Sequence, residues 1–200
     1  NVSIIDKEAV LEKARELKID GILSHAVDPG VVTAAYVAEK MGLPFQCSYE
    51  SACILQDKYR FRQFLRDNGF NCPNAKGYTN AEEALKDVDY FNWPVIVKPV
   101  DSAGSKGVTK VEKKEDLPSA IDFALSCSIG KHFIIEDFLD KVGAQSSADI
   151  FTVDGKLVYP AYSDQLFDPN AANPYTPAIE IWPATMEQKY QDDLTNQLQR

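Results

Sequence analysis

Four strand-like segments and two helical segments alternate between residues 75 and 136, in the order strand, helix, strand, strand, helix, strand. The strand-like segments are short and rich in β-branched residues, whereas the helical segments place apolar residues on one face. This order favours a small sheet covered by two helices, which is an α+β arrangement. The expected strands are 75–78, 94–100, 108–111 and 132–136, and the expected helices are 79–88 and 115–127.

The segments before this alternation predict part of an open α/β unit. Helix, strand and helix follow one another and lead into an extended stretch, so the first strands of such a sheet would precede residue 1. A further helix then leads into the alternating region. The expected helices are 6–18, 28–41 and 49–68, and the expected strand is 21–25.

The last third of the chain predicts a hairpin and the beginning of a further lobe. Asp154-Gly155 lies between two alternating segments, and Asp-Gly is a strong short-range signal for a β-hairpin. Residues 163–177 are rich in Asp, Asn and Pro and are expected to form a loop, followed by a strand over 178–182. A helix is expected over 186–200. It ends without a cap, so we expect the lobe to continue beyond residue 200.

Charge and composition exclude several classes of protein. The 200 residues carry 21 Lys and Arg against 30 Asp and Glu, a net charge of −9 that argues against a general nucleic-acid binder. No apolar run approaches the length of about 18 residues that a membrane helix needs. The 4 cysteines form no CxxC pair and there are 2 histidines, which disfavours zinc sites and disulfide frameworks and suits a reducing compartment. We therefore expect a cytoplasmic protein without nucleic-acid or membrane partners.

The segment 93–108 carries the strongest chemical signal. A β-branched strand brings Lys98 to its middle, and a loop of small residues follows at once. Small residues let backbone N–H groups approach anionic oxygens closely, and a lysine adds a point charge for phosphate. The pattern is neither a Walker A loop nor a dinucleotide fingerprint, because the loop leads into a strand. From these residues alone, a phosphate-binding loop and an ordinary exposed hairpin remain equally open.

Two other segments have both a functional and a plain structural interpretation. Lys58 stands at the start of a helix, where a cation gains nothing from the helix dipole. Such a position invites a functional role, although a solvated lysine is the commoner case. Glu136 and Asp137 end an apolar strand and could present backbone groups and a carboxylate to a purine. The alternative is an ordinary strand end with two solvated acids.

Taken together, these three segments resemble the ATP-grasp superfamily. The helix DK-x-x-F, the strand PVIVKP with its loop, and the hinge IIE-x-F-L occur in the family's order, most clearly within residues 20–160. The chain looks most like the large-subunit type of carbamoyl phosphate synthetase. The resemblance implies an α/β (α+β) ATP-grasp fold truncated at both ends. Residues 1–56 would end a Rossmann-like pre-ATP-grasp domain, 57–138 would form the ATP-grasp helix and small lobe, and 139–200 would start the larger, incomplete lobe.

The resemblance also implies contacts with ATP, residue by residue. Lysines in two of the motifs would contact the phosphates, the loop would cover the β and γ phosphates, and the hinge would contact adenine. Gln145 stands where the family has a ribose-binding glutamate, and it can hydrogen-bond a hydroxyl without charge assistance. The implied nucleotide contacts are Lys58, Lys98, Ser102, Ala103, Gly104, Ser105, Gly107, Glu136, Asp137, Phe138, Leu139 and Gln145.

The implied activity is that of an ATP-dependent ligase. Such an enzyme activates a carboxylate as an acyl phosphate for attack by an amine or another nucleophile, so its partners are ATP and two small molecules; a homo-oligomer stays open. Ligands for Mg²⁺ are expected beyond residue 200. No residue is assigned as a metal ligand or as catalytic, and the chain alone is expected to be inactive. A catalytically inactive nucleotide-binding or regulatory module, which Gln145 favours, and an unrelated α/β domain are the alternatives.

Overall fold

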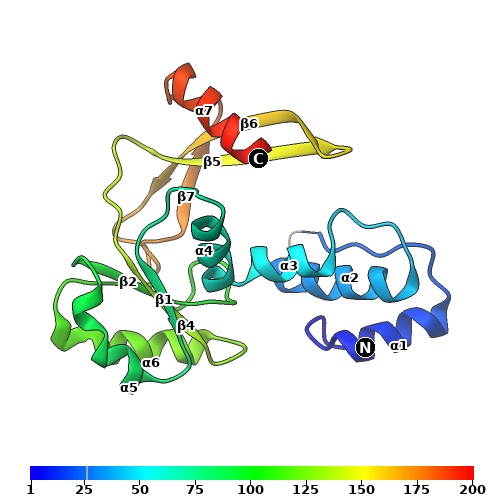
Figure 1. Ribbon diagram of the computed structural model, residues 1–200, viewed down its shortest axis with the longest axis horizontal. Helices are drawn as coiled ribbons and strands as arrows, with labels where there is room; N and C mark the ends of the chain where they lie inside the picture. The colour runs from blue at the N-terminus through cyan, green and yellow to red at the C-terminus, as the bar shows by residue number, and fades with distance from the viewer. Residues whose placement is uncertain (26) are drawn as a thin grey trace. The chain divides into compact units, whose positions relative to one another are not determined.

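The structure is a computed structural model that describes residues 1–25 and 27–200. It contains two compact units, Asn1–Phe138 and Leu139–Arg200 (Figure 1). Of the helices in the described part of the chain, none combines the length and the apolar composition that crossing a bilayer demands.

The first unit opens with three helices, α1 (Lys7–Leu17), α2 (Asp28–Met41) and α3 (Tyr49–Gln56). Buried side chains of α1 and α2 form a small core of their own. The strand expected at 21–25 is wrong, because these residues have no regular structure. A strand needs a neighbour to satisfy its backbone groups, and both sheets in the described residues lie after residue 74.

The single helix expected over 49–68 is also wrong: it is two helices, α3 and α4 (Lys58–Asp67). Asp57 separates them with an extended backbone, ψ 110°. Its carboxylate accepts hydrogen bonds from the N–H groups of Tyr59 (2.9 Å) and Arg60 (3.0 Å). Asp57 therefore caps α4, because an N-cap oxygen satisfies N–H groups that a first turn leaves without partners. This cap places Lys58 at the first helical position.

The small sheet has the predicted order of elements. Its strands are β1 (Ala75–Tyr78), β2 (Val95–Pro99), β3 (Thr109–Val111) and β4 (Phe133–Asp137), and the helices between them are α5 (Ala81–Lys86) and α6 (Leu117–Cys127). The strands lie in the spatial order β1-β4-β2-β3, and each neighbouring pair is antiparallel. Two short 3₁₀ turns, Val88–Tyr90 and Lys114–Asp116, lie in the connections between these elements.

Helices cover both faces of this sheet (Figure 1). Val97 and Ile135 face the main core, which α5 and α6 close with residues such as Ile121. The opposite face carries a second, smaller cluster in which Ile134 packs with Tyr59 of α4. Side chains alternate between faces along a strand. Residues next to the core positions of β2 and β4 therefore face α4.

The second unit is a three-stranded antiparallel sheet with one helix. The strands β5 (Gln145–Val153), β6 (Lys156–Phe167) and β7 (Pro177–Ile181) lie in chain order, and α7 (Gln188–Gln199) follows them. Asp154 and Gly155 both have positive φ, 49° and 76°, as a type I′ hairpin turn requires, so the predicted hairpin is confirmed.

The loop expected over 163–177 is wrong at its start. Residues 163–167 belong to β6, and Asp164 pairs with Ile181 of β7. Ser163 and Asp164, two of the polar residues that suggested a loop, are buried and have hydrogen-bond partners. The Asp164 carboxylate accepts from the N–H (3.0 Å) and the hydroxyl (2.7 Å) of Thr185. A buried polar group that is satisfied in this way is compatible with a strand.

Candidate functional site

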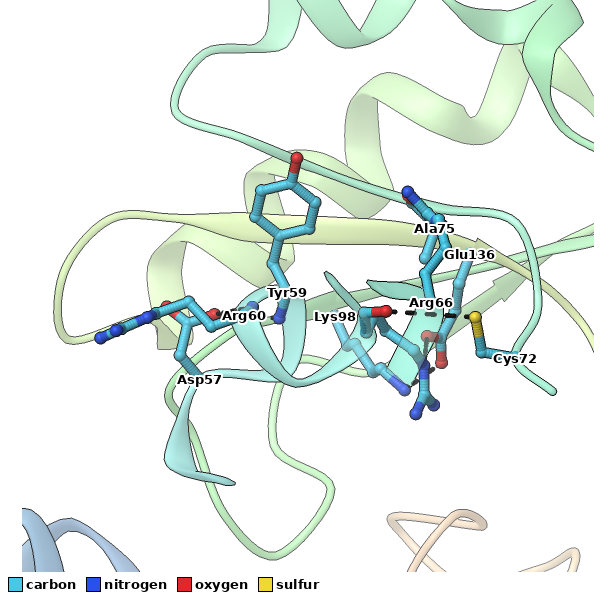
Figure 2. Close-up of polar contacts among 9 residues, drawn as sticks. Asp57, Tyr59, Arg60, Arg66, Cys72, Ala75, Lys98 and Glu136 are labelled. Atoms are coloured by element: carbon cyan, nitrogen blue, oxygen red, sulfur yellow. Dashed lines mark hydrogen bonds and ion pairs between the residues drawn. The ribbon is translucent and has the colours of Figure 1, made fainter. Parts of the chain in front are cut away.

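Two predicted site residues lie on the face of the small sheet that α4 covers. Because Val97 and Ile135 point into the main core, Lys98 on β2 and Glu136 on β4 point to the opposite face. The register pairs Ile96 with Glu136, so the two charged side chains are diagonal neighbours on adjacent strands. Figure 2 shows the ends of the two side chains pointing toward one another.

Glu136 accepts bonds from two cations at once. Lys98 Nζ donates to its Oε1 (Figure 2), and Arg62 Nε on α4 donates to its Oε2 at 2.9 Å. The three side chains are 17% (Lys98), 23% (Arg62) and 6% (Glu136) exposed. Burial by itself would raise the pKa of Glu136, but Lys98 and Arg62 outweigh it and hold that pKa below the usual range of a glutamate. The carboxylate is therefore ionised at neutral pH.

Lys58 is held against the start of the small-residue loop. Its Nζ donates to the carbonyl oxygens of Ser102 (2.7 Å) and Val100 (3.4 Å), and its backbone N–H donates to Val100 O at 3.0 Å. Burial lowers the pKa of Lys58, and the positive charge of Lys98 lowers it further. The two lysines predicted to contact phosphate thus lie within electrostatic reach of each other, on α4 and β2.

The small-residue loop is anchored at its beginning by Asp101. This carboxylate accepts from the hydroxyl of Ser128 (2.9 Å) and from the N–H groups of Ile129 (3.1 Å) and Gly130 (2.6 Å). Asp101 therefore ties the loop to the turn that precedes β4. A carboxylate that receives three hydrogen bonds is well satisfied at a partly buried position.

Gly107 anchors the other end of the loop. Its φ is +75°, and an added Cβ would lie 2.8 Å from Cys127 Cβ and 3.0 Å from Pro99 Cδ. Within the loop, Gly104 and Ser105 also have left-handed backbones, with φ 64° and 56°. The predicted loop residues therefore form a tight turn between two fixed ends. Ser102, Ala103, Gly104, Ser105 and Gly107 lie together in that turn, next to Lys58.

The hinge residues have structural bonds that the sequence did not indicate. The Asp137 carboxylate accepts from Asn92, through its N–H (2.9 Å) and its side-chain amide (2.7 Å), and from the amide of Asn74 (3.0 Å). The backbone N–H of Asp137 donates to Asn74 O, and that of Phe138 donates to Pro94 O at 3.1 Å. These bonds fix the path of the chain as it leaves β4.

Leu139 and Gln145 belong to the second unit. The Leu139 side chain is exposed, at 66%. Gln145 begins β5, and its side-chain amide donates to Gln165 Oε1 on β6 at 3.1 Å. Their predicted contacts with adenine and ribose stay predictions.

Arg62 and Asp101 are the site residues that sequence reasoning missed. For Arg62 a signal was present, since it follows Lys58 by four positions and so shares its helix face. Its partner Glu136 is 74 residues away, which no local pattern reveals. Asp101 was included in the loop, but its partners at 128–130 come from another part of the chain.

The described residues do not fit a magnesium site. Among residues 1–25 and 27–200, no group of three His, Cys, Asp or Glu side chains is placed to hold a metal ion. The acids near the two lysines are engaged elsewhere: Asp57 caps α4, Asp101 binds the 128–130 turn, and Glu136 pairs with two cations.

In sequence, this chain is similar to a family model and to several curated proteins. A family model described as an ATP-grasp domain matches residues 55–176. The carbamoyl phosphate synthase large chain of Thermotoga petrophila is 24% identical over 188 residues, which are 94% of this chain and 17% of that protein. A formate-dependent phosphoribosylglycinamide formyltransferase from a Synechococcus species is 30% identical over 138 residues, 67% of this chain and 35% of that protein. The chain thus spans at most about a third of the length of these relatives.

Solved structures share the fold along nearly the whole chain. An L-amino acid ligase from Bacillus licheniformis matches with a TM-score of 0.72 and 20% identity, over 97% of this chain and 45% of that one. The biotin carboxylase domain of a Hydrogenobacter thermophilus 2-oxoglutarate carboxylase was solved with MgADP, ADP and bicarbonate. It matches with a TM-score of 0.75 and 16% identity, over 98% of this chain and 44% of that one. The predicted ATP-grasp fold is confirmed. Because the family model covers more than half of the residues, the chain belongs to the ATP-grasp family.

Proposed function

We propose that this chain is the nucleotide-binding part of an ATP-dependent ligase that activates a carboxylate as an acyl phosphate. The observation that carries the proposal is the convergence of Lys58 and Lys98 beside the loop 101–107. Two partly buried ammonium groups that repel each other destabilise the free protein, and a polyanion between them relieves that repulsion. A nucleoside triphosphate is such an anion.

The proposed reaction requires little covalent chemistry from the side chains of the protein. In phosphoryl transfer, catalysis is mostly positioning and the stabilisation of developing charge. Lys58 and Lys98 supply charge, and the loop from Ser102 to Gly107 supplies backbone N–H groups close to the phosphates. The hinge Glu136–Leu139 is proposed to hold the adenine, and Gln145 the ribose.

The acid and the nucleophile stay open within this proposal. The relatives are named as carbamoyl phosphate synthase and as a formyltransferase, and the structural neighbours include an amino acid ligase and a biotin carboxylase. Their substrates differ, although all of them share the fold. The proposal is therefore limited to an acyl phosphate that an amine or another nucleophile then attacks.

Lys98→Ala tests the phosphate contact. The variant should bind ATP about ten- to a hundredfold more weakly, because losing a charge-assisted hydrogen bond costs about 1.5–3 kcal/mol. Lys58→Ala should show a smaller loss of the same kind. The matched control is Lys113→Ala, since Lys113 is exposed and precedes the turn Lys114–Asp116. Titration calorimetry measures the affinity. ATP binding by Lys98→Ala that equals the parent's would refute the proposal.

A catalytically inactive nucleotide-binding module is the second candidate. The observation that favours it is Gln145, an uncharged residue at the position of the family's ribose-binding glutamate. The two candidates differ in turnover. Hydroxylamine traps acyl phosphates as hydroxamates, so the intact protein with ATP and a panel of carboxylic acids should give hydroxamate if it is a ligase. ATP binding without any hydroxamate or ADP would favour the inactive module.

A further inference from the structure

Lys98, one of the two lysines proposed for the phosphates, is already engaged in an ion pair. Its ammonium donates to Oε1 of Glu136 (Figure 2), while Arg62 Nε donates to Oε2 of the same carboxylate at 2.9 Å. The Glu136 side chain is only 6% exposed. A carboxylate this deeply buried needs a charged partner, because it has lost most of its contact with water.

A nucleotide phosphate and Glu136 therefore compete for the ammonium of Lys98. Both groups are anions, and a lysine head is a compact point charge. If Lys98 turned to the phosphate and Glu136 had no second cation, the buried carboxylate would be left unpaired, and binding would be opposed. Among the described residues, Lys98 and Arg62 are the two cations that form ion pairs with Glu136.

Arg62 has the chemistry that removes this conflict. A guanidinium keeps its charge in proteins, and its planar fork of five donors can bind both oxygens of a carboxylate. Arg62 lies one helical turn after Lys58 on α4, so one helix face supplies both a phosphate lysine and this counter-ion. We infer that Arg62 is a positioning residue for the nucleotide, which holds Glu136 when Lys98 turns to the phosphate. The inference rests on the proposed function.

A double-mutant cycle on the full chain tests the inference. Arg62→Gln alone should weaken ATP binding about tenfold, a coupling within the range for one ion-pair network, because Lys98 becomes the sole counter-ion of Glu136. In a Glu136→Gln background the same change should alter the dissociation constant by less than about twofold, since a neutral amide does not retain Lys98. Titration calorimetry with ATP gives the four constants.

Two further variants control for the loss of charge and for a failure of Arg62→Gln to fold. Arg60→Gln removes the same charge from the same helix, and Arg60 points away from the ion pairs (Figure 2), so it should leave ATP affinity unchanged. Arg62→Lys keeps the charge but loses the fork, and serves if Arg62→Gln fails to fold. It should weaken binding by about threefold, and this loss should disappear with Glu136→Gln.

The outcomes separate the inference from the proposed function. A parent protein that binds no ATP refutes the proposed function, and this is known before any Arg62 variant is made. Equal losses for Arg62→Gln in both backgrounds would mean that Arg62 contacts the phosphates directly, and would overturn the inference. A variant that is less stable but binds ATP like the parent would overturn it as well, because the role of Arg62 would then be structural only.

Discussion

Replacing Gly107 with alanine should destabilise the first unit far more than replacing Gly104, although both residues have a left-handed backbone. Their φ angles are +75° and +64°. An L-residue in that region costs about 1–2 kcal/mol, and this cost applies to both positions. The difference between the two variants therefore isolates the effect of packing.

The packing cost of an added methyl group depends on the atoms around each position. At Gly107 a Cβ would lie 2.8 Å from Cys127 Cβ and 3.0 Å from Pro99 Cδ, whereas a Cβ at Gly104 would have no atom of the described residues within 4 Å apart from its chain neighbours. Neither neighbour is the end of a flexible side chain, since Pro99 is a ring on β2 and Cys127 ends α6. Overpacking of this kind costs about 1–3 kcal/mol, so Gly107→Ala should cost about 2 kcal/mol more than Gly104→Ala.

Urea unfolding followed by tryptophan fluorescence measures the difference. The chain has 2 tryptophans, Trp93 in the first unit and Trp182 in the second. With Trp182→Phe in every variant, the signal comes from Trp93, which packs against the main core. Equal free energies of unfolding for the two alanine variants would refute the reasoning, because the close approach at Gly107 would then carry no energetic cost.

Three further predictions concern the ion pairs, the helix cap and the loop. The pKa of Glu136 is lowered in the folded state, so the ionised carboxylate contributes fully to the free energy of unfolding above its ordinary pKa of about 4.3. This contribution is lost as the pH falls through the pKa of the folded state. Glu136→Gln should therefore flatten the acid-induced loss of stability that urea titrations measure below about pH 4.3. Asp57→Ala should cost about 1 kcal/mol through loss of the α4 cap, measured by the same unfolding assay, and Asp57→Asn should restore most of it. Backbone hydrogen exchange in residues 101–107 should slow when ATP is added to the intact protein, and unchanged exchange at saturating ATP would contradict the phosphate-loop assignment.

Local patterns predicted the elements whose signals are local. The order of strands and helices from 75 to 136 follows from β-branched runs and one-sided apolar helices, and both are set within a few residues. The hairpin at Asp154-Gly155 is predictable for the same reason, since the turn itself demands residues that tolerate positive φ. Lys58 and Lys98 were identified from motifs that each lie within one element and the residues next to it.

The errors arose where a longer-range condition decides the structure. Residues 21–25 have a strand-like composition, but a strand forms only where another strand can pair with it. The region 49–68 has a continuous helical composition, yet the Asp57 carboxylate stops one helix and starts the next. Residues 163–165 are polar, but strand pairing and the bonds from Thr185 to Asp164 keep them in β6.

The sequence by itself predicted the residues that are proposed to bind a nucleotide, and tertiary structure decided which of them contact one another. Glu136 reaches Lys98 and Arg62, which are 38 and 74 residues away, because strand register and the alternation of faces put all three on one side of the sheet. Asp101 reaches the turn 128–130 in the same way. Such pairings depend on which strands become neighbours, a property of the whole folded unit. A local pattern shows the charge of each residue, but only the folded chain determines which other charged group lies next to that residue.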